Sequence, residues 1–195
     1  MHFLTSATWI LLASAQEFNL PPPIPVKLLP HDPHWSALAE SEIDRIAITV
    51  GPALLRLCHI GSTAIPGLIA KPVLDLLGVG QSLDALDAVQ NRVEALGYAC
   101  HGEYGFAGRR YYTLNAPETN ERRVQLHCYA NGDPAVVRHL AFRDYLRLSP
   151  DLISEYAREK VRCAALHPDD SHAYTDCKSA WIRGVEASAL KSFSS

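Results

Sequence analysis

Two apolar segments of strand length, residues 54–60 and 73–79, lie close together in the first half of the chain and constrain the fold more than any other feature. Short apolar runs bounded by glycine, proline and polar residues are typical of buried β-strands. The connection between them contains two turn signals, Gly61 to Thr63 and Pro66-Gly67. Because strands joined by short connections usually pair as neighbours, we expect both segments in one sheet. Ile60 should end the first strand, with the turn opening onto a pocket.

Two further segments have the composition of strands. Residues 109–115 are rich in aromatic residues, and residues 123–129 alternate between apolar side chains and polar ones such as Gln125 and His127. The connection over residues 116–122 is short and polar, which predicts a hairpin. We expect this hairpin to extend the same sheet.

The remaining periodic segments indicate helices. Three of them begin with a capping side chain before a proline, at Asp32-Pro33, Asp133-Pro134 and Ser149-Pro150. A fourth helix is expected over residues 83–96, and a last one from about residue 173. The order of these elements predicts an α+β domain with a mixed β-sheet flanked by helices and a helical C-terminal part.

The composition fits one globular domain. The chain has 195 residues, of which 48% are apolar and 20% charged. Its net charge of −3 argues against bulk nucleic-acid binding through a basic surface. Prolines at positions 21–23 and 25 mark a stiff linker. We therefore expect an N-terminal extension over residues 1–23, a domain over residues 24–190 and a tail over residues 191–195.

The N-terminal extension contains an apolar stretch, residues 3–15, that ends in an Ala-x-Ala sequence but has no Lys or Arg before it. Its 13 residues are too few to span a bilayer, and no membrane span is expected elsewhere. We expect a cytoplasmic protein, and secretion directed by this stretch stays open as the alternative.

The five cysteines show no Cys-x-x-Cys spacing. Their odd number and their positions suggest neither a zinc site nor a disulfide framework. We therefore expect five reduced and mostly buried thiols, at Cys58, Cys100, Cys128, Cys163 and Cys177.

The residues between the first two strand segments carry the strongest signal for chemistry. Gly61 lets the backbone approach a ligand closely, and the N–H groups and hydroxyls of Ser62 and Thr63 can hold phosphate oxygens. Lys71 adds a positive charge just before the second strand. Asp75 lies inside that apolar strand, where a carboxylate is costly unless it is paired or binds a metal ion.

The run from His59 to Asp75, HIGSTAIPGLIAKPVLD, resembles the signature of the GrpB family. Further matching motifs occur in order along the chain, one before this run and the others after it: HDPHW at 31–35, GRRYY at 108–112, Leu126-His127, HLAFRDYLR at 139–147, Tyr156 with Lys160, and Tyr174 with Lys178. The resemblance covers about residues 24–190.

This resemblance implies a nucleotidyltransferase-like fold, similar to the palm of polymerase β-type enzymes. In that superfamily a Gly-Ser turn holds nucleotide phosphates, and carboxylates on the next strand bind Mg²⁺. Gly61-Ser62 matches the turn, and Asp75 matches the first carboxylate. Leu77 stands where a second carboxylate is expected, and a later strand offers Gln125 and His127 in place of a third.

We predict that these residues converge on one site. Asp75 and His127 are the expected catalytic residues, and Asp75 is also the expected metal ligand. The expected phosphate- or nucleotide-binding residues are Gly61, Ser62, Thr63, Lys71 and Arg110. Because neighbours on a strand point to opposite faces, only one of Arg109 and Arg110 can share the face of the site, and we choose Arg110.

Two functions stay open. The first is a Mg²⁺-dependent nucleotidyltransferase that acts on a nucleoside triphosphate and an unknown acceptor. The second is a binding module for a nucleotide or a phosphorylated small molecule on a degenerate fold, which the missing carboxylates favour. Single residues also have structural alternatives: an ordinary turn at 61–63, an ion pair of Asp75 with Lys71 or Arg110, and solvated side chains for Lys160 and Lys178.

Overall fold

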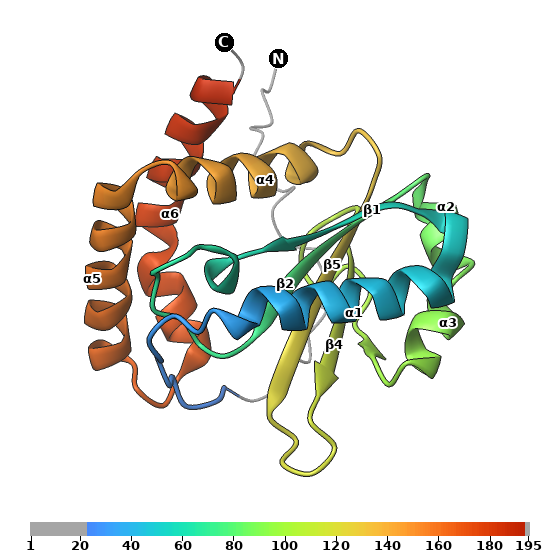
Figure 1. Cartoon of the computed structure of the whole chain (residues 1–195), viewed down its shortest axis with the longest axis horizontal. Coiled ribbons are helices and arrows are strands. Elements are labelled where there is room, and N and C mark those ends of the chain that lie inside the picture. Colours follow the sequence, from blue (N-terminus) through green and yellow to red (C-terminus); the bar gives the residue numbers. More distant parts are fainter. Residues whose placement is uncertain (1–22, 194–195) are drawn as a thin grey trace, which may run out of the picture.

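A mixed five-stranded sheet lies at the centre of the fold (Figure 1). The computed structural model describes residues 23–193. The strands follow the order β1-β2-β5-β4-β3 and comprise β1 Leu54–Ile60, β2 Leu74–Gly80, β3 Ala99–Cys100, β4 Arg110–Asn115 and β5 Arg122–Ala130. Strands β2 and β5 are parallel, and the other neighbouring pairs are antiparallel. The predicted pairing of the first two strands and the predicted β4–β5 hairpin are confirmed.

Helices cover both faces of the sheet, as expected for the predicted α+β class (Figure 1). Leu76 of β2 packs in a core with the first helices, and its neighbour Leu77 packs on Val136 in a second core. The helices are α1 His34–Val50, α2 Leu83–Asp87, α3 Gln90–Ala95, α4 Pro134–Arg147, α5 Pro150–Leu166 and α6 Ser171–Phe193, and short 3₁₀ turns span Gly51–Ala53 and Ser62–Ala64. Alternate residues of one strand therefore serve two separate cores.

The helix expected over residues 83–96 is broken in two. Val89, between α2 and α3, has φ −108° and ψ 4°, which lie outside the range of an α-helix. The expectation of one continuous helix was therefore wrong. Its expected apolar face is nevertheless the buried one, because Leu86, Val89 and Val93 all pack in the core beneath α1.

The C-terminal part is a hairpin of α5 and α6, which lie side by side in Figure 1. A disulfide between Cys163 and Cys177 joins the two helices, with a Cα–Cα distance of 5.8 Å. Cys58, Cys100 and Cys128 are free. The expectation of five reduced thiols was therefore wrong for one pair, because the two cysteines lie on different helices and only the hairpin brings them together.

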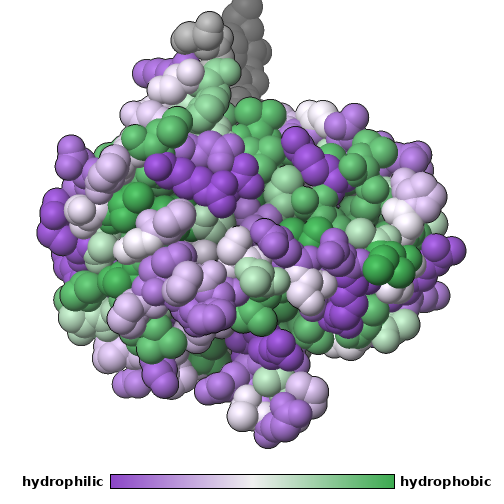
Figure 2. All heavy atoms as spheres, viewed as in Figure 1, coloured by the Kyte–Doolittle hydropathy of each residue, from purple (hydrophilic) through white to green (hydrophobic). Residues whose placement is uncertain are grey.

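Residues 1–22 of the expected extension and residues 194–195 of the expected tail lie outside the described residues, whereas residues 191–193 of that tail belong to α6. From Ile24 onward the chain is attached to the α5–α6 turn: the Ile24 N–H donates to Ser171 Oγ (3.2 Å), and the Val26 N–H donates to the Pro168 carbonyl (2.7 Å). None of the described helices combines the length and the apolar character needed to cross a bilayer. Hydrophilic and hydrophobic residues are interspersed over the face seen in Figure 2.

Candidate functional site

The turn after β1 is built for close contact with Asp75. Gly61 has φ 69°, a left-handed conformation that favours glycine. A Cβ atom at this position would collide with the Asp75 carboxylate and would lie 2.7 Å from its Cβ atom. Gly61 therefore lets the turn and the carboxylate occupy the same corner between β1 and β2.

The two hydroxyls of the turn have different environments. Thr63 is buried, and its Oγ1 lies 2.9 Å from His59 Nε2 and donates to the Val73 carbonyl (3.3 Å). It thus ties the end of β1 to the start of β2. Ser62 is half-buried and lies beside the Tyr156 hydroxyl of α5. Of the two predicted phosphate-binding hydroxyls, Ser62 is therefore the more accessible to a ligand.

Asp75 and His127 lie on the same face of the sheet, as predicted. His127 Nε2 is 3.8 Å from Asp75 Oδ1, and their side chains are 14% and 30% exposed. His127 Nδ1 is buried without a hydrogen-bond partner. His139 of α4 lies on its other side, and the two ring centroids are 5.9 Å apart. Burial lowers the pKa of His139 to about 3. A carboxylate of β2 and an imidazole of β5 thus lie next to each other, both partly buried.

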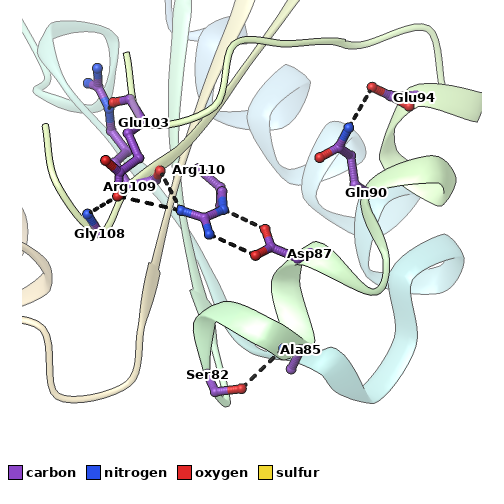
Figure 3. Close-up of polar contacts among 9 residues, drawn as sticks. All are labelled: Ser82, Ala85, Asp87, Gln90, Glu94, Glu103, Gly108, Arg109 and Arg110. Carbon is purple, nitrogen blue, oxygen red and sulfur yellow. Dashed lines mark hydrogen bonds and ion pairs between the residues drawn. The ribbon is translucent and has the colours of Figure 1, made fainter. Parts of the chain in front are cut away.

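Arg110 lies on the other face, so its predicted place in the site was wrong. It pairs in register with Cys128, a residue of the core beneath α1, whereas Tyr111 pairs with His127. Figure 3 shows the Arg110 side chain directed toward Asp87 of α2, to which its Nη2 donates at 2.7 Å. The same register also excludes Arg110 as an ion-pair partner of Asp75.

Arg109 is the arginine on the site face. Its guanidinium carbon lies 4.8 Å from the ring centroid of Tyr111 and 4.4 Å from that of Phe106. Its Nε donates to the Glu103 carbonyl (3.1 Å) and its Nη2 to the Tyr104 carbonyl (2.6 Å). Arg109 therefore holds the loop before β4 against the sheet.

Three lysines gather beside Asp75. The ammonium groups of Lys71 and Lys178 lie 5.6 and 4.6 Å from the ring centroid of Tyr174. Lys160 is 2% exposed, and its Nζ donates to the Ile69 carbonyl (2.7 Å). Among the described residues, no carboxylate forms an ion pair with any of these lysines.

Electrostatics link the lysines to one another and to Asp75. The pKa of Lys178 is lowered to about 8, mainly by burial and to a lesser extent by Lys71, and Asp75 opposes the shift. Burial and then Lys178 hold the pKa of Lys160 well below its usual value. Burial also lowers the pKa of Lys71, again against Asp75. The corner thus gathers three lysines in a partly desolvated place that disfavours their charged forms.

The expectation that Lys160 and Lys178 are solvated was wrong. They come from α5 and α6, which return to the β1–β2 corner only in the folded domain. The sequence contained one usable signal, a tyrosine four residues before each lysine, at Tyr156 and Tyr174. In a helix this spacing places the ring and the ammonium group on one face.

Two arginines of α4 hold the corner in place. Nη1 of Arg143 donates to the His59 carbonyl (2.9 Å), and Nε of Arg147 donates to the Ala64 carbonyl (2.9 Å). Both also form ion pairs with Asp144. These contacts fix the backbone on both sides of the Gly-Ser turn.

Comparisons with known proteins agree on one family. The model described as GrpB protein matches residues 25–188. UPF0157 protein YqkA of Bacillus subtilis is 38% identical over 174 residues, which cover 89% of this chain and 50% of that protein. The chain therefore spans about half the length of that curated relative.

A solved structure supports the same family. The crystal structure of conserved protein GrpB from Enterococcus faecalis matches with a TM-score of 0.80 and 34% identity, over 87% of this chain and 100% of that chain. The Cid1 poly(U) polymerase with MgGTP bound matches with a TM-score of 0.49 and 17% identity, over 74% of this chain and 45% of that chain, which is too low a likeness to bear on function. From the family match and the shared fold, the chain belongs to the GrpB family.

Proposed function

We propose that this protein binds the polyphosphate group of a nucleotide at the corner formed by Ser62, Asp75 and the three lysines, and transfers the nucleotidyl group to an acceptor. The single observation that supports this most is the gathering of three lysines. Lys71, Lys160 and Lys178 come together at a corner where Asp75 is the carboxylate that acts on all three.

A purely structural role explains these lysines poorly. A buried ammonium group is costly unless hydrogen bonds and an opposite charge offset its desolvation. Lys160 donates a hydrogen bond to the Ile69 carbonyl. The nearby Lys178 makes a positive charge on Lys160 still more costly. A polyanionic ligand would supply the missing negative charge, since phosphate oxygens accept hydrogen bonds from several ammonium groups at once.

Mg²⁺ fits the site together with such a ligand. The half-exposed Asp75 offers one carboxylate, and the buried Leu77, which stands where a second was expected, offers none. Mg²⁺ is commonly held by one or two carboxylates, substrate phosphates and water. When bound, the ion would neutralise charge on the phosphates.

His127 is our candidate for the general base. Its Nε2 lies 3.8 Å from Asp75 Oδ1, and its side chain is 14% exposed. In the proposed transfer, the acceptor oxygen forms a bond to the α-phosphorus, the bond to pyrophosphate breaks, and the imidazole takes the proton of the acceptor hydroxyl. Proton transfer of this kind needs a base within hydrogen-bond reach of the attacking group.

The second candidate is a binding module without transfer chemistry. Leu77 favours it, because this side chain is fully buried in the core beneath α4 and leaves Asp75 without a second carboxylate on its strand. Both candidates predict binding, and only the first predicts release of pyrophosphate.

Calorimetric titration with ATP, CTP, GTP and UTP, with and without MgCl₂, tests the shared part of the proposal. We expect Lys178→Gln to weaken binding by about tenfold, as loss of one charge-assisted hydrogen bond would. The exposed Lys27→Gln is the matched control and should bind as the wild type does. Binding that Lys178→Gln leaves unchanged would contradict the proposed site.

A pyrophosphate-release assay then separates the two candidates. The transferase predicts release that depends on Mg²⁺ and on Asp75, so Asp75→Asn should abolish it. Tight binding with no release under any acceptor mixture would favour the binding module.

A further inference from the structure

The disulfide between α5 and α6 is next to the lysines that we assign to ligand binding. Cys163 follows Lys160 by three residues on α5, and Cys177 directly precedes Lys178 on α6. The sulfur atoms therefore lie within one helical turn of both lysines along the chain. Nothing in the proposed transfer chemistry uses these sulfur atoms.

A second contact joins the same helices on the other side of the lysines. The ring of Tyr156 on α5 stacks on Trp181 of α6, with centroids 4.6 Å apart and an interplanar angle of 4°. Lys160 lies between Tyr156 and Cys163 on α5, and Lys178 lies between Cys177 and Trp181 on α6. The lysines are thus enclosed by a covalent link toward the hairpin turn and an aromatic stack farther from it.

We propose that the Cys163–Cys177 disulfide is a positioning device that holds Lys160 and Lys178 in the ligand site, so that thiol redox state sets how well the site binds a polyanion. This inference rests on the proposed function for its ligand. Its positioning part concerns only the two ammonium groups and can be measured without any ligand.

Mutual repulsion is the reason the link matters. Lys178 and Lys71 both act against the charge of Lys160, which is almost fully buried. The repulsion favours separation of α5 from α6, or a turn of the lysine side chains toward water. A covalent bond one turn away opposes that separation, whereas the Tyr156–Trp181 stack alone opposes it more weakly.

The surroundings of the disulfide suit thiol exchange. Nη2 of Arg162 donates to Cys163 Sγ (3.4 Å) and to Cys177 Sγ (3.3 Å). A nearby guanidinium stabilises a thiolate, which is the leaving group when a disulfide is opened. Cys177 is partly exposed and Cys163 is fully buried, so an incoming thiolate reaches the sulfur of Cys177 first.

A dithiol can serve as the reductant in this exchange. The first thiolate of the dithiol bonds to Cys177 Sγ as the S–S bond breaks, and Cys163 leaves as a thiolate. Its second thiol then attacks the mixed disulfide, closes the ring of the reagent and releases Cys177. Two electrons and two protons pass from the dithiol to the cysteine pair.

Lysine labelling on the full-length protein tests the positioning part. The oxidised protein and the same protein reduced with dithiothreitol are treated with a low concentration of acetic anhydride, and acetylation is followed by peptide mass spectrometry. We expect reduction to raise the labelling rates of Lys160 and Lys178 by about fivefold or more, in the range of typical coupling between sites. The exposed Lys27 is the internal control and should not change.

Calorimetric titration with MgATP tests the ligand part. We expect reduction to weaken binding by about fivefold or more. Cys163→Ser/Cys177→Ser should behave as the reduced protein in either buffer, and Cys100→Ser, outside the link, should keep the redox dependence. Reduced wild type has the same sequence as the oxidised form, so a folding defect of the double variant cannot mask the result.

Equal labelling rates and equal affinities in both redox states would overturn the inference. Redox-dependent labelling with no nucleotide binding in either state would support the positioning role and contradict the proposed function. Redox-independent labelling with tight nucleotide binding would contradict the positioning role and support the proposed function.

Discussion

The contact between Gly61 and Asp75 predicts the outcome of a single methyl substitution. In Gly61→Ala the new Cβ has two costs. It forces an L-residue into a left-handed conformation at φ 69°, and it meets the carboxylate and the Cβ of Asp75. Gly67 has a similar φ of 80°, but a Cβ there would have no neighbour within 4 Å. Gly67→Ala is therefore a matched control that carries the first cost alone.

The magnitudes follow from these two costs. A left-handed non-glycine residue costs about 1–2 kcal/mol, which is the expected loss of unfolding free energy in Gly67→Ala. Overpacking against a fixed neighbour costs about 1–3 kcal/mol more. Gly61→Ala should therefore lose about 2–5 kcal/mol in total, with Asp75 displaced from the corner.

Urea denaturation followed by circular dichroism measures both variants under identical conditions. We expect a lower midpoint for Gly61→Ala than for Gly67→Ala, with similar slopes. In addition, Gly61→Ala should lose the effect of Mg²⁺ on nucleotide binding, because the proposed metal ligand has moved. Equal losses of stability in the two variants would refute the reasoning, since the collision with Asp75 would then have no cost.

Three further outcomes follow from the described contacts. Arg110→Ala should leave calorimetric nucleotide affinity unchanged and cost no more than about 1 kcal/mol in urea denaturation, because its ion pair with the half-exposed Asp87 lies on the opposite face of the sheet from Asp75. The pKa of Lys178 is lowered to about 8 from 10.5, so between these pH values the unfolded chain binds more protons than the folded one. The free energy of unfolding should therefore rise as pH increases through this window. Nucleotide affinity should fall above pH 8, because the ammonium group loses its proton, and calorimetric titrations at several pH values would measure this fall. His127→Gln should bind nucleotide within about twofold of the wild type yet lower the rate of pyrophosphate release by about 10²–10⁴-fold, and a rate equal to that of the wild type would remove His127 as the general base.

Local pattern was enough to predict the frame of the site. Apolar runs and a short connection predicted β1 beside β2, and strict alternation predicted that Asp75 and His127 share a face. Both inferences depend on geometry that repeats every two residues and on short connections. Neither needs knowledge of the rest of the chain.

The errors other than the broken helix over residues 83–96 concern placement by distant parts of the chain. Arg109 and Arg110 are adjacent, and the choice between them depends on the register of β4 with β5. The positions of Lys160 and Lys178 depend on how α5 and α6 return to the sheet, and the disulfide depends on the same hairpin. Such contacts leave little trace in local periodicity.

The parallel pairing of β2 with β5 has a consequence for synthesis of the chain. Leu74 pairs with Val124, 50 residues later (124 − 74). At about 5–20 residues per second, the apolar β2 waits roughly 2–10 s for its second partner after it has been made. During that time one edge of the strand that carries Asp75 is open, and an open apolar edge is a template for pairing with other chains. We therefore expect the nascent chain to be most prone to aggregation, and most dependent on chaperones, between completion of β2 and completion of β5.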